Sequence, residues 1–246
     1  MERKNFLKNS FTALGLVAVA PLMNACKKED VSGSSSTNTT GTGSSSGSGG
    51  CMEAPTETQG PFPTKQPSAY QRSNIVDDRS GVPFTINITI QNTNNSCAAL
   101  AGAIVDIWHC DKDGHYSEYG GSGMQTVNYT AVHFLRGRQI TDTNGLVSYT
   151  SIFPGWYSGR ATHIHVHIYN ASGTSLKVTQ IAFPEGSSSA VTLVNTTASG
   201  YTKGMSGYTT NSNDNVFGDG YSAELATVTG SVSGGYTLTH TIAVAG

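Results

Sequence analysis

Charged side chains are scarce in this sequence. Aspartate, glutamate, lysine and arginine make up 12% of its 246 residues, about half of the usual share of roughly 25%. This composition disfavours long solvent-exposed helices and coiled coils, which depend on charged surface positions. The formal net charge is −2, and a mildly acidic protein is a poor partner for phosphate backbones. We therefore expect no nucleic-acid partner.

The apolar run near the N-terminus is too short to cross a bilayer. It extends from Phe11 to Leu22 and follows a basic start, which is typical of a signal peptide. The pair Ala25-Cys26 then resembles the lipidation box of bacterial lipoproteins. We expect a signal peptide at 1–25 and lipidation of Cys26, which gives an exported, membrane-anchored protein. An ordinary secretory signal with an incidental cysteine is the alternative.

Residues 32–50 contain only serine, glycine, threonine and asparagine. Such a segment has no apolar area to bury against the entropy cost of ordering, so it predicts a flexible tether. The predicted organisation is a signal peptide at 1–25, a lipid anchor and tether at 26–50, and one folded domain at 51–246.

The cysteines lack the Cys-x-x-Cys spacing of many zinc sites. If Cys26 carries the lipid, three cysteines remain in an oxidising compartment, which predicts one disulfide and one thiol. We expect Cys97 to pair with Cys110, because they flank a short segment. An extended strand between them would hold them too far apart, so the state of Cys51 stays open.

No segment of ten or more residues after Cys51 has a convincing helical period. Residues 84–90 alternate apolar and polar side chains instead, as a half-buried strand does. Asp113-Gly114 and Asn144-Gly145 are strong turn signals. Many short strands with such turns predict an all-β fold, an antiparallel sandwich or barrel. The other predicted strands are 103–109, 146–153, 162–169, 176–183 and 236–244.

Three histidines, His163, His165 and His167, alternate along one of these strands. Alternate residues of a strand share one face, so neighbouring imidazoles can converge on a metal ion. Imidazole suits iron, zinc or copper. The alternative is a polar, solvent-facing strand that happens to be rich in histidine.

Two tyrosines follow predicted turns. Tyr116 follows Asp113-Gly114, and Tyr157 follows Pro154-Gly155 close to the start of the histidine strand. Either tyrosine alone would usually be a packing residue. Their order along the chain, together with the histidines, makes the pattern specific.

The order of motifs resembles the intradiol ring-cleavage dioxygenases, the catechol and protocatechuate 3,4-dioxygenase family. The chain lacks the helical N-terminal dimerisation segment of the intracellular members and is more similar to secreted, single-chain ones. The family implies an antiparallel β-sandwich with a prealbumin-like core and long active-site loops. The matching stretches are 58–62, 105–116, 134–137, 141–142, 153–165 and 179–180, with a looser match after Ser187.

The resemblance implies Fe(III) as the cofactor, held by Tyr116, Tyr157, His163 and His165. A hard trivalent cation favours anionic oxygen donors, and a bound metal lowers the pKa of a phenol. The catalytic residues would be Tyr157, Arg160 and Gln180. In the family one tyrosinate leaves the metal and accepts a substrate proton, and here this role falls on Tyr157. Arg160 would stabilise developing charge.

The implied partners are a small-molecule catechol and O2, and the implied reaction is ring cleavage to a muconate-type diacid, as in the catabolism of aromatic compounds. We expect His167 to lie too far along its strand to bind the metal. Phe62 stands where many members carry a tyrosine near the substrate. The expected substrate-binding residues are Phe62, Trp108, His115 and Arg160.

Two other classes of protein compete with this interpretation. Residues 102–103, 141–145 and 153–157 also resemble prealbumin-like modules that only bind, but these have no need of Tyr116, His163 and His165 together. A cupin metalloenzyme needs a glutamate at a fixed spacing after its histidines, which His165 lacks. The sequence leaves open the catechol used, the oligomeric state, the membrane face and the export route.

Overall fold

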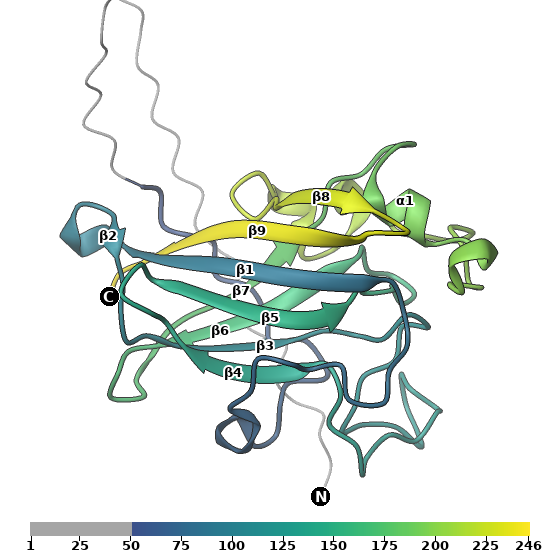
Figure 1. Cartoon of the computed structure of the whole chain (residues 1–246), viewed down its shortest axis with the longest axis horizontal. Helices are drawn as coiled ribbons and strands as arrows, with labels where there is room; N and C mark the ends of the chain where they lie inside the picture. Colours follow the sequence, from purple (N-terminus) through teal and green to yellow (C-terminus); the bar gives the residue numbers. More distant parts are fainter. Residues whose placement is uncertain (1–50) are drawn as a thin grey trace, which may run out of the picture. The chain divides into compact units, whose positions relative to one another are not determined.

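The computed structural model describes residues 51–246 (Figure 1). The predicted signal peptide, the lipidated Cys26 and the tether at 26–50 lie outside these residues. No helix of the described part is long and apolar enough to cross a membrane.

Strands dominate the described residues, which confirms the predicted all-β class (Figure 1). The only α-helix in this part is α1, Ala190–Val194, and it has 5 residues. Short 3-10 helices lie at Pro67–Tyr70, Thr93–Asn95, Thr197–Ser199, Asn211–Asn213 and Phe217–Asp219. The strands are β1 Pro83–Asn92, β2 Ala98–Ala99, β3 Ile104–Trp108, β4 Arg136–Ile140, β5 Leu146–Ile152, β6 His163–Tyr169, β7 Ser175–Ala182, β8 Thr227–Ser231 and β9 Gly235–Val244.

The strands form two sheets. In one sheet β1 pairs with β9 on one edge and with β5 and β2 on the other, and β8 lies outside β9. The other sheet has the order β4-β3-β6-β7. The strand pairs are antiparallel except β1–β9, which is parallel and corrects the purely antiparallel prediction. These two strands come from opposite ends of the domain, so no hairpin turn forces them to run in opposite directions.

The two sheets contribute side chains to one hydrophobic core. In β1 the alternation predicted from the sequence holds, with Phe84, Ile86 and Ile88 buried. The same core contains Val105 and Ile107 of β3, and also Ile164, Val166 and Ile168 of β6 and Leu238 and Ile242 of β9. Burial of the isoleucines of β6 on this side turns its histidines toward the opposite face of the sheet.

Three strands were not predicted. β4 begins with Arg136, which is fully buried and donates to the Phe62 carbonyl and to Ser117. β8 is polar and largely exposed, and β2 has only 2 residues. None of them shows a two-residue alternation of apolar side chains, which is the pattern that predicts a strand. Backbone pairing with neighbouring strands, and not an apolar face, holds them in the sheets.

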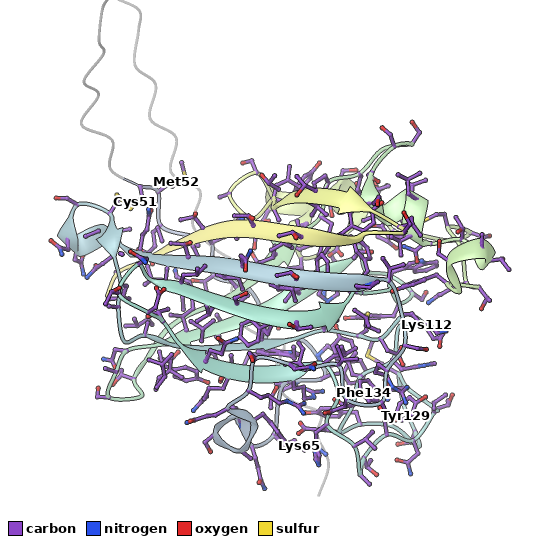
Figure 2. All side chains as sticks on the ribbon, viewed as in Figure 1. Cys51, Met52, Lys65, Lys112, Tyr129 and Phe134 are labelled. Atoms are coloured by element: carbon purple, nitrogen blue, oxygen red, sulfur yellow. A yellow bond between two sulfur atoms is a disulfide. The ribbon has the colours of Figure 1, made fainter. Side chains whose placement is uncertain are left out.

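The predicted disulfide is wrong. Cys97 pairs with Cys51, at a Cα–Cα distance of 5.6 Å, and Cys110 is a buried thiol. Cys97 precedes β2, whereas Cys110 follows the far end of β3, and an extended strand of this length spans about 15 Å, well beyond disulfide reach. Figure 2 labels Cys51 beside β2 and Lys112, close in sequence to Cys110, at the opposite end of the strands.

We expect the Cys51–Cys97 disulfide to stabilise the fold by about 2–4 kcal/mol, because it closes a long loop in the unfolded chain. Urea unfolding with and without reductant measures this difference. The effect of the reductant should vanish in Cys97→Ala and persist in Cys110→Ala. Loss of the effect in Cys110→Ala would contradict the pairing.

Candidate active site

The four predicted metal ligands lie together at one end of β6. Tyr116 comes from the long connection between β3 and β4, Tyr157 from the connection between β5 and β6, and the histidines from β6 itself. The Tyr116 Oη lies 3.2 Å from His163 Nε2, which lies 3.1 Å from His165 Nε2. The Tyr157 ring is 5.8 Å from that of Tyr116 and 5.6 Å from that of His163, between centroids. The structure therefore brings the set together.

Neighbouring rings and one glycine fix the orientation of these side chains. The Trp108 indole stacks on His165 at 4.9 Å between centroids, with 3° between the planes. Phe62 stacks on Tyr116 at 4.8 Å. Gly60 has a φ of +67°, and a Cβ there would lie 2.9 Å from His165 Cε1. Glycine is therefore required at this position, both for the left-handed backbone and for the close approach.

The donor atoms fit a metal ion that takes both nitrogen and oxygen ligands. His163 Nδ1 donates to the Ala161 carbonyl at 2.6 Å, which leaves the Nε2 lone pair directed at the centre. Burial lowers the pKa of both His163 and His165, so both rings are neutral and able to bind a metal. Burial raises the pKa of the Tyr116 phenol, and a bound cation would oppose this shift. In residues 51–246 no group of three or more His, Cys, Asp or Glu is arranged to hold a metal.

Arg160 lies beside two of the predicted metal ligands, Tyr157 and His163. Its side chain is buried, and its Nη1 lies 3.5 Å from Tyr157 Oη and 3.4 Å from His163 Nε2. Its Nη2 donates to Gln180 Oε1, and Gln180 in turn donates to the Thr58 carbonyl at 2.9 Å. The predicted catalytic residues Tyr157, Arg160 and Gln180 thus form one connected group beside the predicted metal ligand His163.

Asp214 holds Arg160 in place, and the sequence analysis missed it. The Arg160 Nε lies 2.9 and 2.8 Å from the two Asp214 carboxylate oxygens. The same carboxylate accepts from the backbone N–H of Ala161 at 2.7 Å and of Val216 at 2.8 Å. Asp214 is 1% exposed. No local pattern marks it, because it lies in the segment after Ser187 where the family resemblance is loose.

An open cleft of about 460 Å³ lies against Tyr157 and Arg160. Of the predicted substrate-binding residues, Arg160 lines this cleft. Phe62 and Trp108 instead stack against two of the predicted metal ligands, Tyr116 and His165. The residues that line the cleft are Thr58, Gly60, Pro61, Met124, Tyr157, Ser158, Gly159, Arg160, Asn215 and Val216.

The histidines outside the ligand set have other contacts. His115 faces Tyr129, with its Nδ1 3.9 Å from Asp111 Oδ1, and it is not among the residues that line this cleft. Its backbone directly follows the Asp111-to-Gly114 turn, where its N–H donates to Asp111 Oδ1 at 2.9 Å. His167 bonds through both ring nitrogens, to Ser175 Oγ and to Tyr169 Oη, each at 2.8 Å. These two bonds occupy both ring nitrogens of His167.

Comparison with known proteins finds similarity to dioxygenases. A sequence model of the family described as Dioxygenase matches residues 58–222. The chlorocatechol 1,2-dioxygenase of Rhodococcus opacus is 27% identical over 143 residues, which are 50% of this chain and only 47% of that relative. The chain therefore matches about half the length of this curated relative.

Solved structures of dioxygenases are similar to a larger part of the chain than this curated relative is. The structure of an intradiol ring-cleavage dioxygenase from Tetranychus urticae is 29% identical, covers 79% of this chain and 95% of its own, and has a TM-score of 0.68. The 3-chlorocatechol 1,2-dioxygenase of Rhodococcus opacus 1CP is 19% identical, with coverage of 78% and 72% and a TM-score of 0.53. At that identity the likeness shows the fold alone.

Proposed function

Since the chain belongs to the intradiol ring-cleavage dioxygenase family, we propose that it is an Fe(III) enzyme that cleaves a catechol between its hydroxylated carbons. Catechol and O2 would combine to a muconate-type diacid, with both oxygen atoms in the product and no reductant consumed. The observation that carries the proposal is that His163 Nε2 lies 3.2 Å from Tyr116 Oη and 3.1 Å from His165 Nε2, with the Tyr157 ring beside that of Tyr116. A binding module of the same fold has no need of such a set.

In this proposal Tyr116, Tyr157, His163 and His165 hold the iron. The bound ferric ion would supply the charge that deprotonates the catechol and makes it reactive toward O2. Mixed phenolate and imidazole donors suit a hard trivalent cation and leave room for a chelating substrate. Tyr116 and both histidines are buried, which keeps water away from these three side chains.

Tyr157 is the residue best placed to accept a proton from the substrate. It is less buried than Tyr116, and it lines the cleft. Burial raises the pKa of the Tyr157 phenol, and Arg160 lowers it to a smaller extent, so the phenol would hold at Oη a proton received from the substrate. Arg160 then remains beside the reacting atoms as a fixed positive charge, which stabilises negative charge as it develops on the substrate.

The visible spectrum of the iron-loaded protein tests this proposal. Tyrosinate-to-iron charge transfer should colour the protein red-brown, and anaerobic addition of catechol should shift the band. Admission of air should then consume one O2 for each muconate formed. A colourless protein that holds zinc and consumes no O2 with simple catechols would favour the binding module instead.

We expect Tyr157→Phe to keep most of its iron and lose about 100-fold or more in turnover, because proton transfer by a positioned group contributes roughly 10²–10⁴-fold. Tyr116→Phe should lose iron and turnover together, since Tyr116 lies within 3.2 Å of a histidine ligand and has no role at the cleft. Iron content and O2 uptake separate the two variants. Equal losses of iron in both would contradict the assignment of Tyr157.

We also propose that the two sheets form the prealbumin-like sandwich of the family and that the protein is exported with a lipid on Cys26. The Ala25-Cys26 pair and the polar segment after it support the anchor. The intact mass of the protein extracted from membranes should correspond to a chain that begins at a lipidated Cys26. An unmodified Cys26, or retention of residues 1–25, would refute the anchor.

A further inference from the structure

Gln125 binds both polar groups of the Tyr116 backbone. Its Oε1 accepts the Tyr116 N–H at 2.7 Å, and its Nε2 donates to the Tyr116 carbonyl at 2.8 Å. The same Nε2 lies 2.9 Å from the Tyr119 carbonyl oxygen and 3.3 Å from that of Val127. Gln125 is 4% exposed, and a buried polar group that loses its partners is costly. One side chain therefore fixes the backbone of a proposed iron ligand.

The loop that carries Gln125 is otherwise open to solvent. It spans residues 119–128 in the connection between β3 and β4, and Gln125 alone among these residues is buried. The preceding residue, Met124, is 70% exposed and lines the cleft of the candidate site. The two arms of the loop meet at Gly120, where a Cβ would lie 1.9 Å from the Val127 carbonyl oxygen. The loop thus directs one polar side chain inward, onto Tyr116.

The two proposed tyrosine ligands are restrained to different extents. Tyr116 is fully buried, Phe62 stacks on its ring, and Gln125 binds its backbone. Tyr157 is half-buried and lines the cleft, and its carbonyl accepts the Arg160 N–H at 3.1 Å in a short turn. A functional group has to be held within about 0.5 Å and 10–20° of its productive geometry. Tyr116 has the contacts that hold a ligand in this way.

We propose that Gln125 is a positioning residue that keeps Tyr116 on the iron while Tyr157 is free to leave it. The inference rests on the proposed function and adds the residue that makes one tyrosine a permanent ligand. Once a catechol replaces Tyr157, Tyr116 is the one tyrosine left in the set, so freedom of its backbone would weaken metal binding most at that stage. Groups that support metal ligands contribute roughly 10–100-fold to metal affinity or activity.

Hydrogen exchange in the iron-free protein tests the restraint on Tyr116. Gln125→Met keeps the length of the side chain and removes its hydrogen bonds. We expect the Tyr116 amide proton, followed by NMR, to exchange about fivefold faster in this variant, because it loses its acceptor. Gln125→Glu keeps an acceptor for this N–H and should restore slow exchange. Gln139→Met removes a glutamine that donates to the Ser148 carbonyl in the sheet, and it should leave the Tyr116 rate unchanged.

Release of Fe(III) tests the role of the restraint at the metal. The loaded protein is kept under nitrogen with a competing chelator, with and without catechol, and its iron content is measured at intervals after gel filtration. With catechol, we expect release about tenfold faster from Gln125→Met than from the parent protein or Gln139→Met. Without catechol the difference should be smaller, because Tyr157 then still binds the metal. General loosening of the fold would not depend on catechol.

The outcomes separate the role of Gln125 from the proposed function. Parental rates of Tyr116 exchange and of iron release in Gln125→Met would refute the role of Gln125 and leave the dioxygenase proposal intact. Equal acceleration in Gln139→Met would refute it as well. Faster exchange in Gln125→Met, together with a parent protein that binds no iron, would support the restraint on Tyr116 and overturn the dioxygenase proposal.

Discussion

A His163→Ala variant is expected to lose its iron and to cleave catechol at least about 100-fold more slowly than the parent protein. Removal of groups that only support metal ligands already costs roughly 10–100-fold, and His163 is proposed as a ligand itself. Its Nε2 is 3.2 Å from Tyr116 Oη and 3.1 Å from His165 Nε2, so its removal takes away the nitrogen at the centre of the set. Iron content, the red-brown absorption band and O2 uptake measure the loss.

His167→Ala is the matched control, because it removes an imidazole from the same face of the same strand. Both nitrogens of that ring already bond to Ser175 and Tyr169. We expect iron content within measurement error of the parent protein and little change in turnover. If His167→Ala lost iron as His163→Ala does, the ligand set would have to be redrawn.

The second large effect is expected from Asp214→Ala. This substitution leaves the Arg160 guanidinium, which is 6% exposed, without the carboxylate that binds its Nε. Breaking a buried ion pair by removing one partner costs about 3–5 kcal/mol, since the remaining charge stays buried and uncompensated. The backbone N–H groups of Ala161 and Val216 lose an acceptor as well. Chemical denaturation measures the change in the free energy of unfolding.

Two comparisons give this prediction its controls. Asp78→Ala removes an ion pair with Arg79 in which the carboxylate side chain is 59% exposed, and exposed pairs contribute about 0–1 kcal/mol. Asp214→Asn keeps a carbonyl acceptor, so it should recover part of the stability. Turnover should stay low, because the two carboxylate oxygens that bind Arg160 Nε are no longer both present. Asp214→Ala with the stability and turnover of the parent protein would show that the pair does not position Arg160.

Much of the site follows from local patterns in the sequence. Alternation along 162–169 puts His163 and His165 on one face, because successive residues of any strand point to opposite sides of the sheet. The turn at Asp113-Gly114 and the Pro154-Gly155 pair place Tyr116 and Tyr157 next to strands. The same reasoning gives six of the nine strands, all with an apolar face that must be buried. The sequence therefore determines the all-β class, and its resemblance to the family singles out the two tyrosines and two histidines that the fold brings together.

Contacts between distant segments depend on the tertiary structure. The Arg160–Asp214 pair joins residues 54 positions apart, and the Cys51–Cys97 disulfide joins residues 46 apart. The parallel pairing of β1 with β9 and the contact of His115 with Tyr129 depend equally on how the chain packs. A local pattern records which face of a strand is buried and where the chain turns. It does not record which distant residue lies opposite, because that is fixed only when the two sheets pack around their shared core and the loops close over the site.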